Sequence, residues 1–158
     1  MKIIDCFMYF DEDMMLDIRL NVLDKFVSHF VICEAAFNHK GVSKKLNFNI
    51  NNFSKFKNKI SYVVADKQPD TLRKIYGNDD ENSRNSKILD NALIRENYQR
   101  NYLTNKLKEF SDDDLIIIND LDEIPNLDNF KYKNKITIFK QKMFYYKLNL
   151  VYPNFLWS

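Results

Sequence analysis

The sequence predicts an α/β fold with a mostly parallel central sheet and helices on both of its faces. Short apolar runs with the length of strands alternate with longer segments in which apolar residues recur at helical spacing, and this order is typical of α/β proteins. The apolar runs are also continuous, as in FVIC and LIII, which is typical of parallel strands buried on both faces.

Each element has its own signal in the chain. The helical segments carry apolar residues at steps of three and four, with Leu89, Leu93, Leu103 and Leu107 as the expected buried stripe of the second one. The polar segment 67–82 is longer than most loops in compact domains. In order, the predicted elements are a strand at 2–10, a helix at 12–26, strands at 29–36 and 60–66, a helix from Ser83 or Ser86 to Phe110, a strand at 115–119 and a β-rich segment at 136–152.

Length and composition favour one globular domain over residues 1–158. A hydrophobic content of 45% and a charged content of 29% are ordinary for a folded chain. The net charge of +2 argues against a protein that binds nucleic acid chiefly by charge. The only two glycines, Gly41 and Gly77, stand apart and match no glycine-rich phosphate loop.

Compartment signals favour a cytoplasmic chain. Cys6 and Cys33 lie inside apolar runs, which predicts two buried free thiols rather than a disulfide. Neither a signal peptide nor an apolar window of about 18 residues is visible, so no membrane segment is expected. The chain ends on the apolar run NFLWS, which predicts that it is a piece of a longer protein.

Acidic residues follow four of the predicted strands. In parallel sheets, ligands bind beyond the carboxyl ends of the strands, where these side chains would gather. The four acids are Asp11, Glu34, Asp66 and Asp120.

The clearest chemical motif is the run LIIINDLDEIP at 115–125. In an extended segment, Asp120 and Asp122 point the same way while Leu121 turns back to the core. Two carboxylates about 7 Å apart by strand rise can share one Mg²⁺ or Mn²⁺, whose remaining positions are filled by substrate phosphate oxygens. The apolar stem and Pro125 would hold the turn rigid, so the motif predicts a metal site of the DxD type.

A second signal lies in the segment IRENYQRN of the long helix. Glu96 and Arg100 are four residues apart on the expected buried face, which is the spacing of a helical ion pair. Two interpretations stay open: the pair fixes the helix to the sheet, or Arg95 or Arg100 binds diphosphate or supports the metal-binding acids.

Further polar candidates lie at the other strand ends. Asp11, Glu12 and Arg19 surround the first strand–helix junction, where acids ordinarily serve as helix caps. Glu34 ends the second strand, where it is either simply exposed or accepts a hydrogen bond from a uracil or ribose hydroxyl. His39 lies in a small loop beside it, as a surface residue or a catalyst.

Five segments in this order resemble glycosyltransferase family 17, the β-1,4-mannosyl-glycoprotein 4-β-N-acetylglucosaminyltransferase family. They are DCFMYFDEDMMLDIRLNVL, FVICEAAFNHKG, RENYQRN, DDDLIIINDLDEIP and KQKMFYYKLNL. The resemblance covers nearly the whole chain and implies a GT-A-like nucleotide-sugar-binding domain. It implies an inverting transferase that uses UDP-N-acetylglucosamine and acts on mannose of N-glycans. Animal members carry an N-terminal membrane anchor, and this chain shows none.

The resemblance also implies roles for individual residues. Asp120, Asp122 and Glu123 would form the metal site for Mn²⁺ or Mg²⁺, and Asp120 would also contact the nucleotide. The remaining expected donor-site residues are Asp11, Glu12 and Glu34 near the nucleotide, and Arg19, Arg95 and Arg100 near its phosphates or the acids. The expected partners are a nucleotide-sugar donor and a glycan acceptor, and the residues single out no general base.

Two alternatives stay open from the sequence. A sugar-nucleotide-binding module without transferase activity would carry the same motifs. An apolar strand ending in DxD is also the nucleophile motif of haloacid-dehalogenase-type phosphatases, although that motif usually lies near the N-terminus and is followed by Thr, Val or Gly.

Overall fold

The computed structural model describes residues 1–145 and 149–157. The chain divides into two compact units, Met1–Asp122 and Glu123–Ser158, and each is described by itself. The expectation of one domain over 1–158 stays a prediction.

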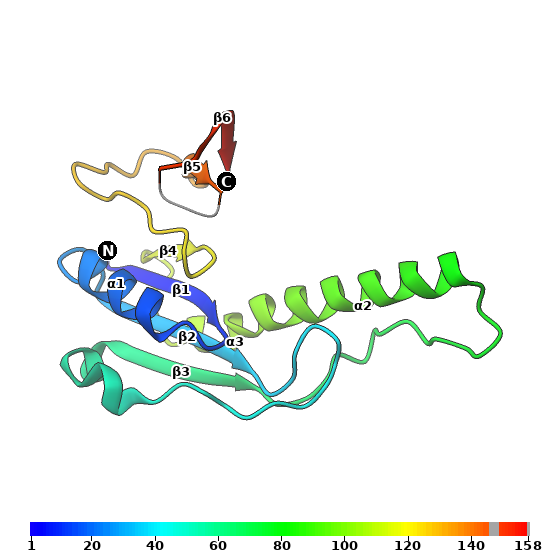
Figure 1. The fold of residues 1–158 in the computed structure, drawn as a ribbon. Coiled ribbons are helices and arrows are strands. Elements are labelled where there is room, and N and C mark those ends of the chain that lie inside the picture. Colours follow the sequence, from blue (N-terminus) through cyan, green and yellow to red (C-terminus); the bar gives the residue numbers. More distant parts are fainter. Residues whose placement is uncertain (146–148, 158) are drawn as a thin grey trace. The chain divides into compact units, whose positions relative to one another are not determined.

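A four-stranded sheet forms the centre of the first unit, with the strand order β3-β2-β1-β4 (Figure 1). All three strand pairs are parallel, and β1 lies between β2 and β4. The strands are β1 Ile3–Tyr9, β2 His29–Ala35, β3 Ile60–Ala65 and β4 Leu115–Ile118. Each strand lies where the sequence predicts one, and the parallel α/β fold is confirmed.

The two faces of the sheet are covered by different helices. Side chains alternate along β1, so Ile4 and Cys6 pack on one face while Asp5 and Phe7 point to the other. The face of Ile4 and Cys6 packs against the end of α2 (Glu81–Tyr102) and the short α3 (Thr104–Leu107). The opposite face packs against α1 (Asp13–Leu23) and the 3₁₀ segment η1 (Ile50–Lys59).

Cys6 and Cys33 lie together in the core on the α2 face. Both thiols are buried and free, as the sequence predicts. Burial raises the pKa of each thiol to about 12, so both stay protonated at neutral pH.

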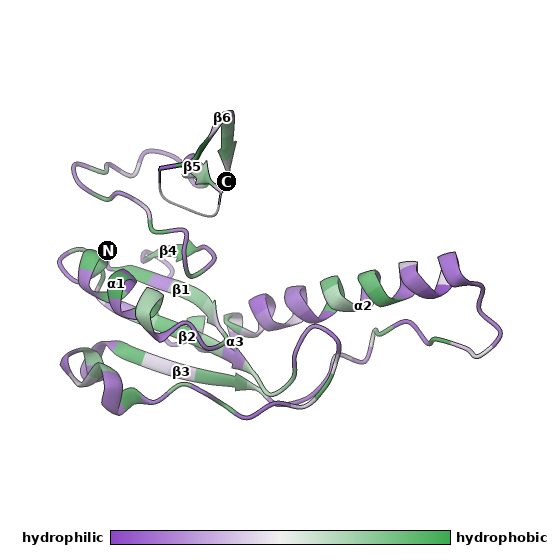
Figure 2. Ribbon diagram, in the orientation of Figure 1, coloured by the Kyte–Doolittle hydropathy of each residue, from purple (hydrophilic) through white to green (hydrophobic). Residues whose placement is uncertain are grey.

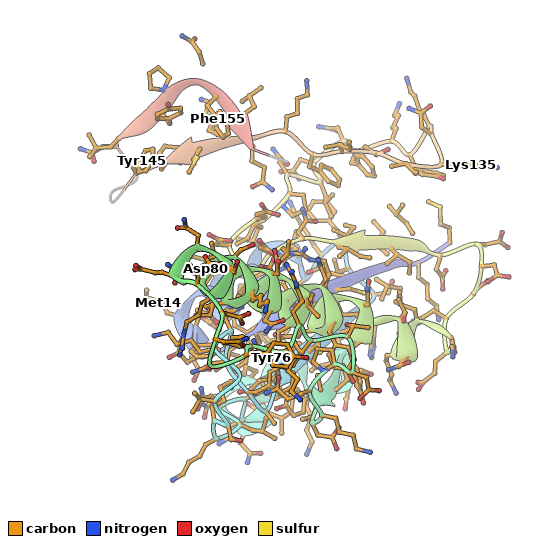
Figure 3. All side chains as sticks on the ribbon, turned by 90° about the vertical axis from the view of Figure 1, so that its right-hand side faces the viewer. Met14, Tyr76, Asp80, Lys135, Tyr145 and Phe155 are labelled. Carbon is orange, nitrogen blue, oxygen red and sulfur yellow. The ribbon has the colours of Figure 1, made fainter. Side chains whose placement is uncertain are left out.

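The long helix differs from its prediction at both ends. It begins at Glu81 because the Asp80 side chain accepts a hydrogen bond from the Ser83 amide and caps it. Figure 3 looks along α2 from this end, with Asp80 near the viewer. The helix ends at Tyr102, and a separate turn of helix, α3, follows at Thr104–Leu107.

The predicted buried stripe of this helix is half wrong. Leu103 is fully buried, but Leu89 and Leu93 are 71% and 56% exposed. The reason is geometric: the first half of α2 extends beyond the sheet, beside the loop that precedes it (Figure 1). In Figure 2 the strands of the sheet are mostly hydrophobic, whereas hydrophobic and hydrophilic turns alternate along α2, including the part that extends beyond the sheet.

The segment between β3 and α2 is an irregular loop, as predicted from its length and polarity. The buried Asn91 side chain holds it, because its amide accepts from the Arg73 backbone N–H at 2.7 Å and donates to the Arg73 carbonyl at 2.9 Å. Arg73 also forms an ion pair with Asp90. The loop is therefore fixed along the exposed half of α2.

In the described part of the second unit, β5 Gln141–Phe144 and β6 Val151–Trp157 form an antiparallel pair. The β-rich prediction for 136–152 is confirmed for 141–144 and for the start of β6, whereas 136–140 form no strand. Residues 146–148 of that prediction lie outside the described residues. Within the described part of the chain, no helix combines the length and the hydrophobicity that a membrane crossing requires.

Candidate functional site

The DxD acids lie at the carboxyl edge of the parallel sheet. Asp120 and Asp122 follow β4 in an irregular turn, and both line a cavity of about 520 Å³. Leu121, between them, is only 7% exposed. Leu121 is therefore largely buried as expected, but it borders the cavity together with the two acids, and the segment is a turn rather than the extended chain that was expected, so the alternation of side chains stays a prediction.

The first unit alone supplies the walls of this cavity. The end of β1, the start of α1, the loop after β2, the second half of α2 and the turn after β4 all contribute. The lining residues are Met8, Tyr9, Phe10, Glu12, Met15, His39, Glu96, Gln99, Asp120, Leu121 and Asp122. A volume of this size is typical of pockets for small molecules.

Arg19 lies beneath the DxD turn rather than in the cavity. It is fully buried, and its guanidinium makes a two-point ion pair with Asp5, with Nε and Nη2 each 2.8 Å from a carboxylate oxygen. Its Nη1 donates to the backbone carbonyls of Asp120 at 2.8 Å and Leu121 at 3.1 Å. The expectation that Arg19 lies near the acid cluster therefore agrees with the structure, but the contact is to the backbone.

Arg100 approaches the same turn from α2. Its Nη2 lies 3.0 Å from Asp120 Oδ1 and 3.2 Å from Glu96 Oε1. The helical ion pair predicted from the spacing is thus present, and it extends to the first acid of the DxD motif. All three side chains are between 35% and 44% exposed, so the network is open to solvent and to a ligand.

Glu12 organises the turn between β1 and α1. Its Oε2 accepts hydrogen bonds from the backbone amides of Phe10 and Asp11, both at 3.0 Å. Glu12 lines the cavity, whereas Asp11 is exposed and is absent from the lining. Of the two acids predicted for the nucleotide at this turn, the structure brings Glu12 to the site.

Glu34 is fully buried and its carboxylate is surrounded by protein donors. Oε1 accepts from Lys44 Nζ and from the Asn47 amide at 2.8 Å. Oε2 accepts from the Phe48 amide at 3.1 Å and from the Tyr62 hydroxyl at 2.7 Å. A carboxylate has about four lone-pair positions, and these four donors fill them. The contacts favour a structural role for Glu34, as the anchor of residues 44–48, over direct contact with a nucleotide.

Arg95 holds the loop after β2 against α2. It donates to Gln68 Oε1 at 2.7 Å and to the His39 carbonyl at 3.0 Å, and Gln68 in turn donates to the Gly41 carbonyl. Arg95 lies outside the 520 Å³ cavity, in whose wall His39 takes part. It therefore supports a cavity wall instead of meeting the acid cluster.

The donor set fits a hard divalent cation that is only partly held by protein. Within residues 1–145 and 149–157, no three His, Cys, Asp or Glu side chains form a complete metal cage. Mg²⁺ characteristically takes one or two carboxylates and completes its octahedron with water and substrate phosphate, and Asp120 and Asp122 offer two carboxylates on a cavity wall. Glu123 belongs to the second unit, so its predicted place beside them stays a prediction.

Two residues of this region, Asp5 and Gln99, were not predicted from the sequence. A lone acid in a buried strand, such as Asp5, signals a buried cationic partner. Arg19 lies on the apolar stripe of α1 between Leu16 and Leu23, which is the matching signal. Gln99 lines the cavity and donates to the Cys33 carbonyl at 2.9 Å, and its sequence context carried no comparable signal.

Comparison with known proteins identifies the family of this chain. The family model of glycosyltransferase family 17 matches residues 1–157. The chain belongs to glycosyltransferase family 17. It is also similar to the β-1,4-mannosyl-glycoprotein 4-β-N-acetylglucosaminyltransferases of Homo sapiens and Rattus norvegicus, at 30% identity over 122 residues of each.

That similarity covers 72% of this chain but only 20% of each relative, so the chain matches about a fifth of their length. No solved structure matches the fold significantly. Membership of family 17 favours a transferase over the phosphatase alternative for the DxD motif.

Proposed function

We propose that this member of family 17 is the donor-binding part of a metal-dependent, inverting glycosyltransferase. Its donor would be a UDP-sugar, and the acceptor a glycan hydroxyl. The observation that carries the proposal is the pair Asp120 and Asp122 on the wall of a cavity at the carboxyl edge of a parallel sheet. The proposed sugar, N-acetylglucosamine, rests on the names of the two relatives.

Asp120 and Asp122 would hold a Mn²⁺ or Mg²⁺ ion together with the donor diphosphate. When bound, such an ion neutralises the charge that develops on the leaving UDP. Leu121, between the two acids, is largely buried and anchors the turn that carries them. Arg100 orients the Asp120 carboxylate through their 3.0 Å contact.

The cavity walls would exclude water from the donor and orient it. Glu12 fixes the turn after β1 through two backbone amides, and Arg95 fixes the loop that carries His39. These contacts hold the walls in place before a ligand arrives, which lowers the ordering cost of binding. An acceptor hydroxyl would then attack the anomeric carbon from the side opposite the diphosphate.

A binding experiment tests the proposal directly. Thermal unfolding is measured with UDP-, GDP- and CMP-sugars, each with and without Mn²⁺. A ligand that binds only the folded state at about 100 times its Kd stabilises by about 2.7 kcal/mol, which is a readily measured rise in Tm. We expect UDP-sugars to raise the Tm only when Mn²⁺ is present.

The matched variants are Asp122→Ala and Asp112→Ala. Asp112 is an exposed acid at the opposite end of β4, so its loss removes the same charge away from the cavity. We expect Asp122→Ala to abolish the Mn²⁺-dependent rise and Asp112→Ala to preserve it. Unchanged binding by Asp122→Ala would contradict the proposal.

Turnover distinguishes transfer from binding alone. Release of UDP from UDP-N-acetylglucosamine, with and without mannose-containing glycans, is measured on the wild-type chain. UDP binding without any turnover would favour the non-catalytic binding module, and hydrolysis of a generic aryl phosphate would favour the phosphatase.

A further inference from the structure

We propose that Arg19 and Asp5 form a positioning pair that sets the shape of the DxD turn from beneath. The cation-binding consequence rests on the proposed function, whereas the positioning itself concerns the protein without any ligand. Both side chains are fully buried, so neither touches the donor.

The guanidinium of Arg19 donates hydrogen bonds both to the Asp5 carboxylate and to the backbone of the DxD turn. Nε and Nη2 are directed at the two oxygens of Asp5 on the central strand β1. Nη1 is thereby aimed at the carbonyls of Asp120 and Leu121, 101 and 102 residues further along the chain. The Phe7 ring, with its centroid 4.7 Å from the guanidinium carbon, completes the site. The contacts with Asp5 and Phe7 thus fix the orientation of the Arg19 guanidinium independently of its contacts with the turn.

Holding two consecutive carbonyls constrains the turn strongly. When both peptide oxygens point at one nitrogen, the planes of two successive peptide groups are set, and with them the directions of the side chains between and beside them. The largely buried Leu121 and the two acids beside it, all of which border the cavity, therefore take their directions from this backbone. Arg19 thus decides through the backbone where the carboxylates lie.

Stability alone does not account for such a pair. A buried ion pair gives little advantage over apolar residues of similar volume, because desolvation of both charges offsets their attraction. Apolar residues could not, however, donate to the two carbonyls of the turn. The role specific to Arg19 is therefore the hold on the Asp120 and Leu121 backbone.

Arg100 holds the same turn by a different route. It contacts the Asp120 carboxylate at the surface, where it is 36% exposed, and does not reach the backbone. The turn is held between a buried arginine on its carbonyls and an open arginine on its first acid. Once the carboxylates of Asp120 and Asp122 bind a cation, Arg19 is the arginine that still restricts the turn.

The test replaces the pair without leaving a buried charge unpaired. The double variant Asp5→Leu/Arg19→Met removes both charges and keeps apolar volume, so the fold is expected to persist. The control Asp24→Leu/Lys59→Met removes a pair, with atoms 2.8 Å apart, that lies away from the turn. The single variant Arg19→Lys keeps the charge but cannot span both Asp5 and the carbonyls, so it supplies a second test should the double variant not fold.

Two readouts are measured on the whole chain. Hydrogen exchange of peptides covering 115–122, without ligand, is expected to accelerate about tenfold or more in the double variant and in Arg19→Lys, with β2 peptides unchanged. Mn²⁺ affinity, measured by the electron paramagnetic resonance signal of free Mn²⁺, is expected to fall about tenfold or more, as it does when groups that orient metal ligands are lost. The control is expected to match the wild type in both.

The outcomes separate this inference from the proposed function. Unchanged exchange over 115–122 in a folded variant overturns the positioning role. Faster exchange with full Mn²⁺ affinity overturns its link to the cation. If the wild type binds neither Mn²⁺ nor UDP, the proposed function fails, and the exchange comparison still supports or overturns the positioning role.

Discussion

Substitution Glu34→Gln separates a structural role of this buried acid from a nucleotide-binding one. The carboxylate accepts four hydrogen bonds, two on each oxygen, and all come from protein groups. Glutamine keeps the size of the side chain but replaces one oxygen with an NH₂ group, which cannot accept. Two of the four donors therefore face another donor, and Lys44 loses its charged partner.

The expected loss of stability follows from these contacts. Each buried donor left without an acceptor costs about 1–3 kcal/mol, and breaking a buried ion pair costs about 3–5 kcal/mol. Because Lys44 is 13% exposed and water can reach it in part, we expect a total near the lower end, about 3–4 kcal/mol. That is a large share of the roughly 5–15 kcal/mol that stabilises an ordinary domain.

The effect also depends on pH. Burial acts to raise the pKa of the Glu34 carboxyl, but the hydrogen bonds from Lys44, the Asn47 amide, Tyr62 and the Phe48 amide outweigh it and lower the pKa below its usual 4.5. The folded state therefore binds this proton more weakly than the unfolded chain does. The stabilisation is fully present above about pH 4.5 and is lost as the pH falls through the folded-state pKa. The difference between wild type and Glu34→Gln should shrink over that acidic range.

The assay is urea unfolding followed by far-ultraviolet circular dichroism at neutral and acidic pH. Glu109→Gln is the control, because Glu109 is 59% exposed and pairs with Lys106 at the surface, so its loss should cost less than about 1 kcal/mol. A loss below about 1 kcal/mol in Glu34→Gln at neutral pH would contradict the structural role of Glu34. UDP affinity is measured in parallel: a strong decrease in a variant that is still folded would restore the nucleotide-binding role.

The remaining predictions concern a glycine and the two thiols. Gly41→Ala should lower the free energy of unfolding by about 1–3 kcal/mol, because Gly41 has a φ of 82° and an added Cβ would lie 2.5 Å from Arg95 Nη2. Gly77→Ala, with no atom within 4 Å of the added Cβ, should be neutral or slightly stabilising in the same urea titration, and equal effects would contradict the argument. Cys6 and Cys33 should not react with a thiol-specific disulfide reagent at about pH 8 in the native protein and should both react in urea, because burial raises their pKa to about 12. Rapid native labelling would show that this core opens.

Much of the fold and part of the site could be predicted from residue types and their spacing. Continuous apolar runs located the four parallel strands, and the length and polarity of 67–82 located the irregular loop. The ion pair of Glu96 and Arg100 followed from a spacing of four on a helix. Burial of Leu121 followed from two acids around one apolar residue after a strand. Each of these depends on neighbours in the chain, which a single sequence displays.

The points at which the structure differs from these predictions have a different cause. The spacing of Leu89 and Leu93 shows that they share a helix face, but not that this half of α2 extends beyond the sheet. For Glu34, the strand-end position left simple exposure and a nucleotide contact open, and it did not show that Lys44 and the amides of 47 and 48 fold back onto the carboxylate. In both cases the surroundings of a side chain depend on a segment that the local pattern does not place.

Residue types and their order establish which groups this chain has available: parallel strands, an acidic carboxyl edge and two carboxylates around a buried leucine. Which of these groups meet depends on the packing of distant segments, because Arg19 reaches carbonyls more than a hundred residues away and Arg100 reaches Asp120 from another element. Periodicity determines the face on which a side chain lies, whereas its partner depends on how distant segments pack. The buried pair beneath the DxD turn belongs to that second kind of information.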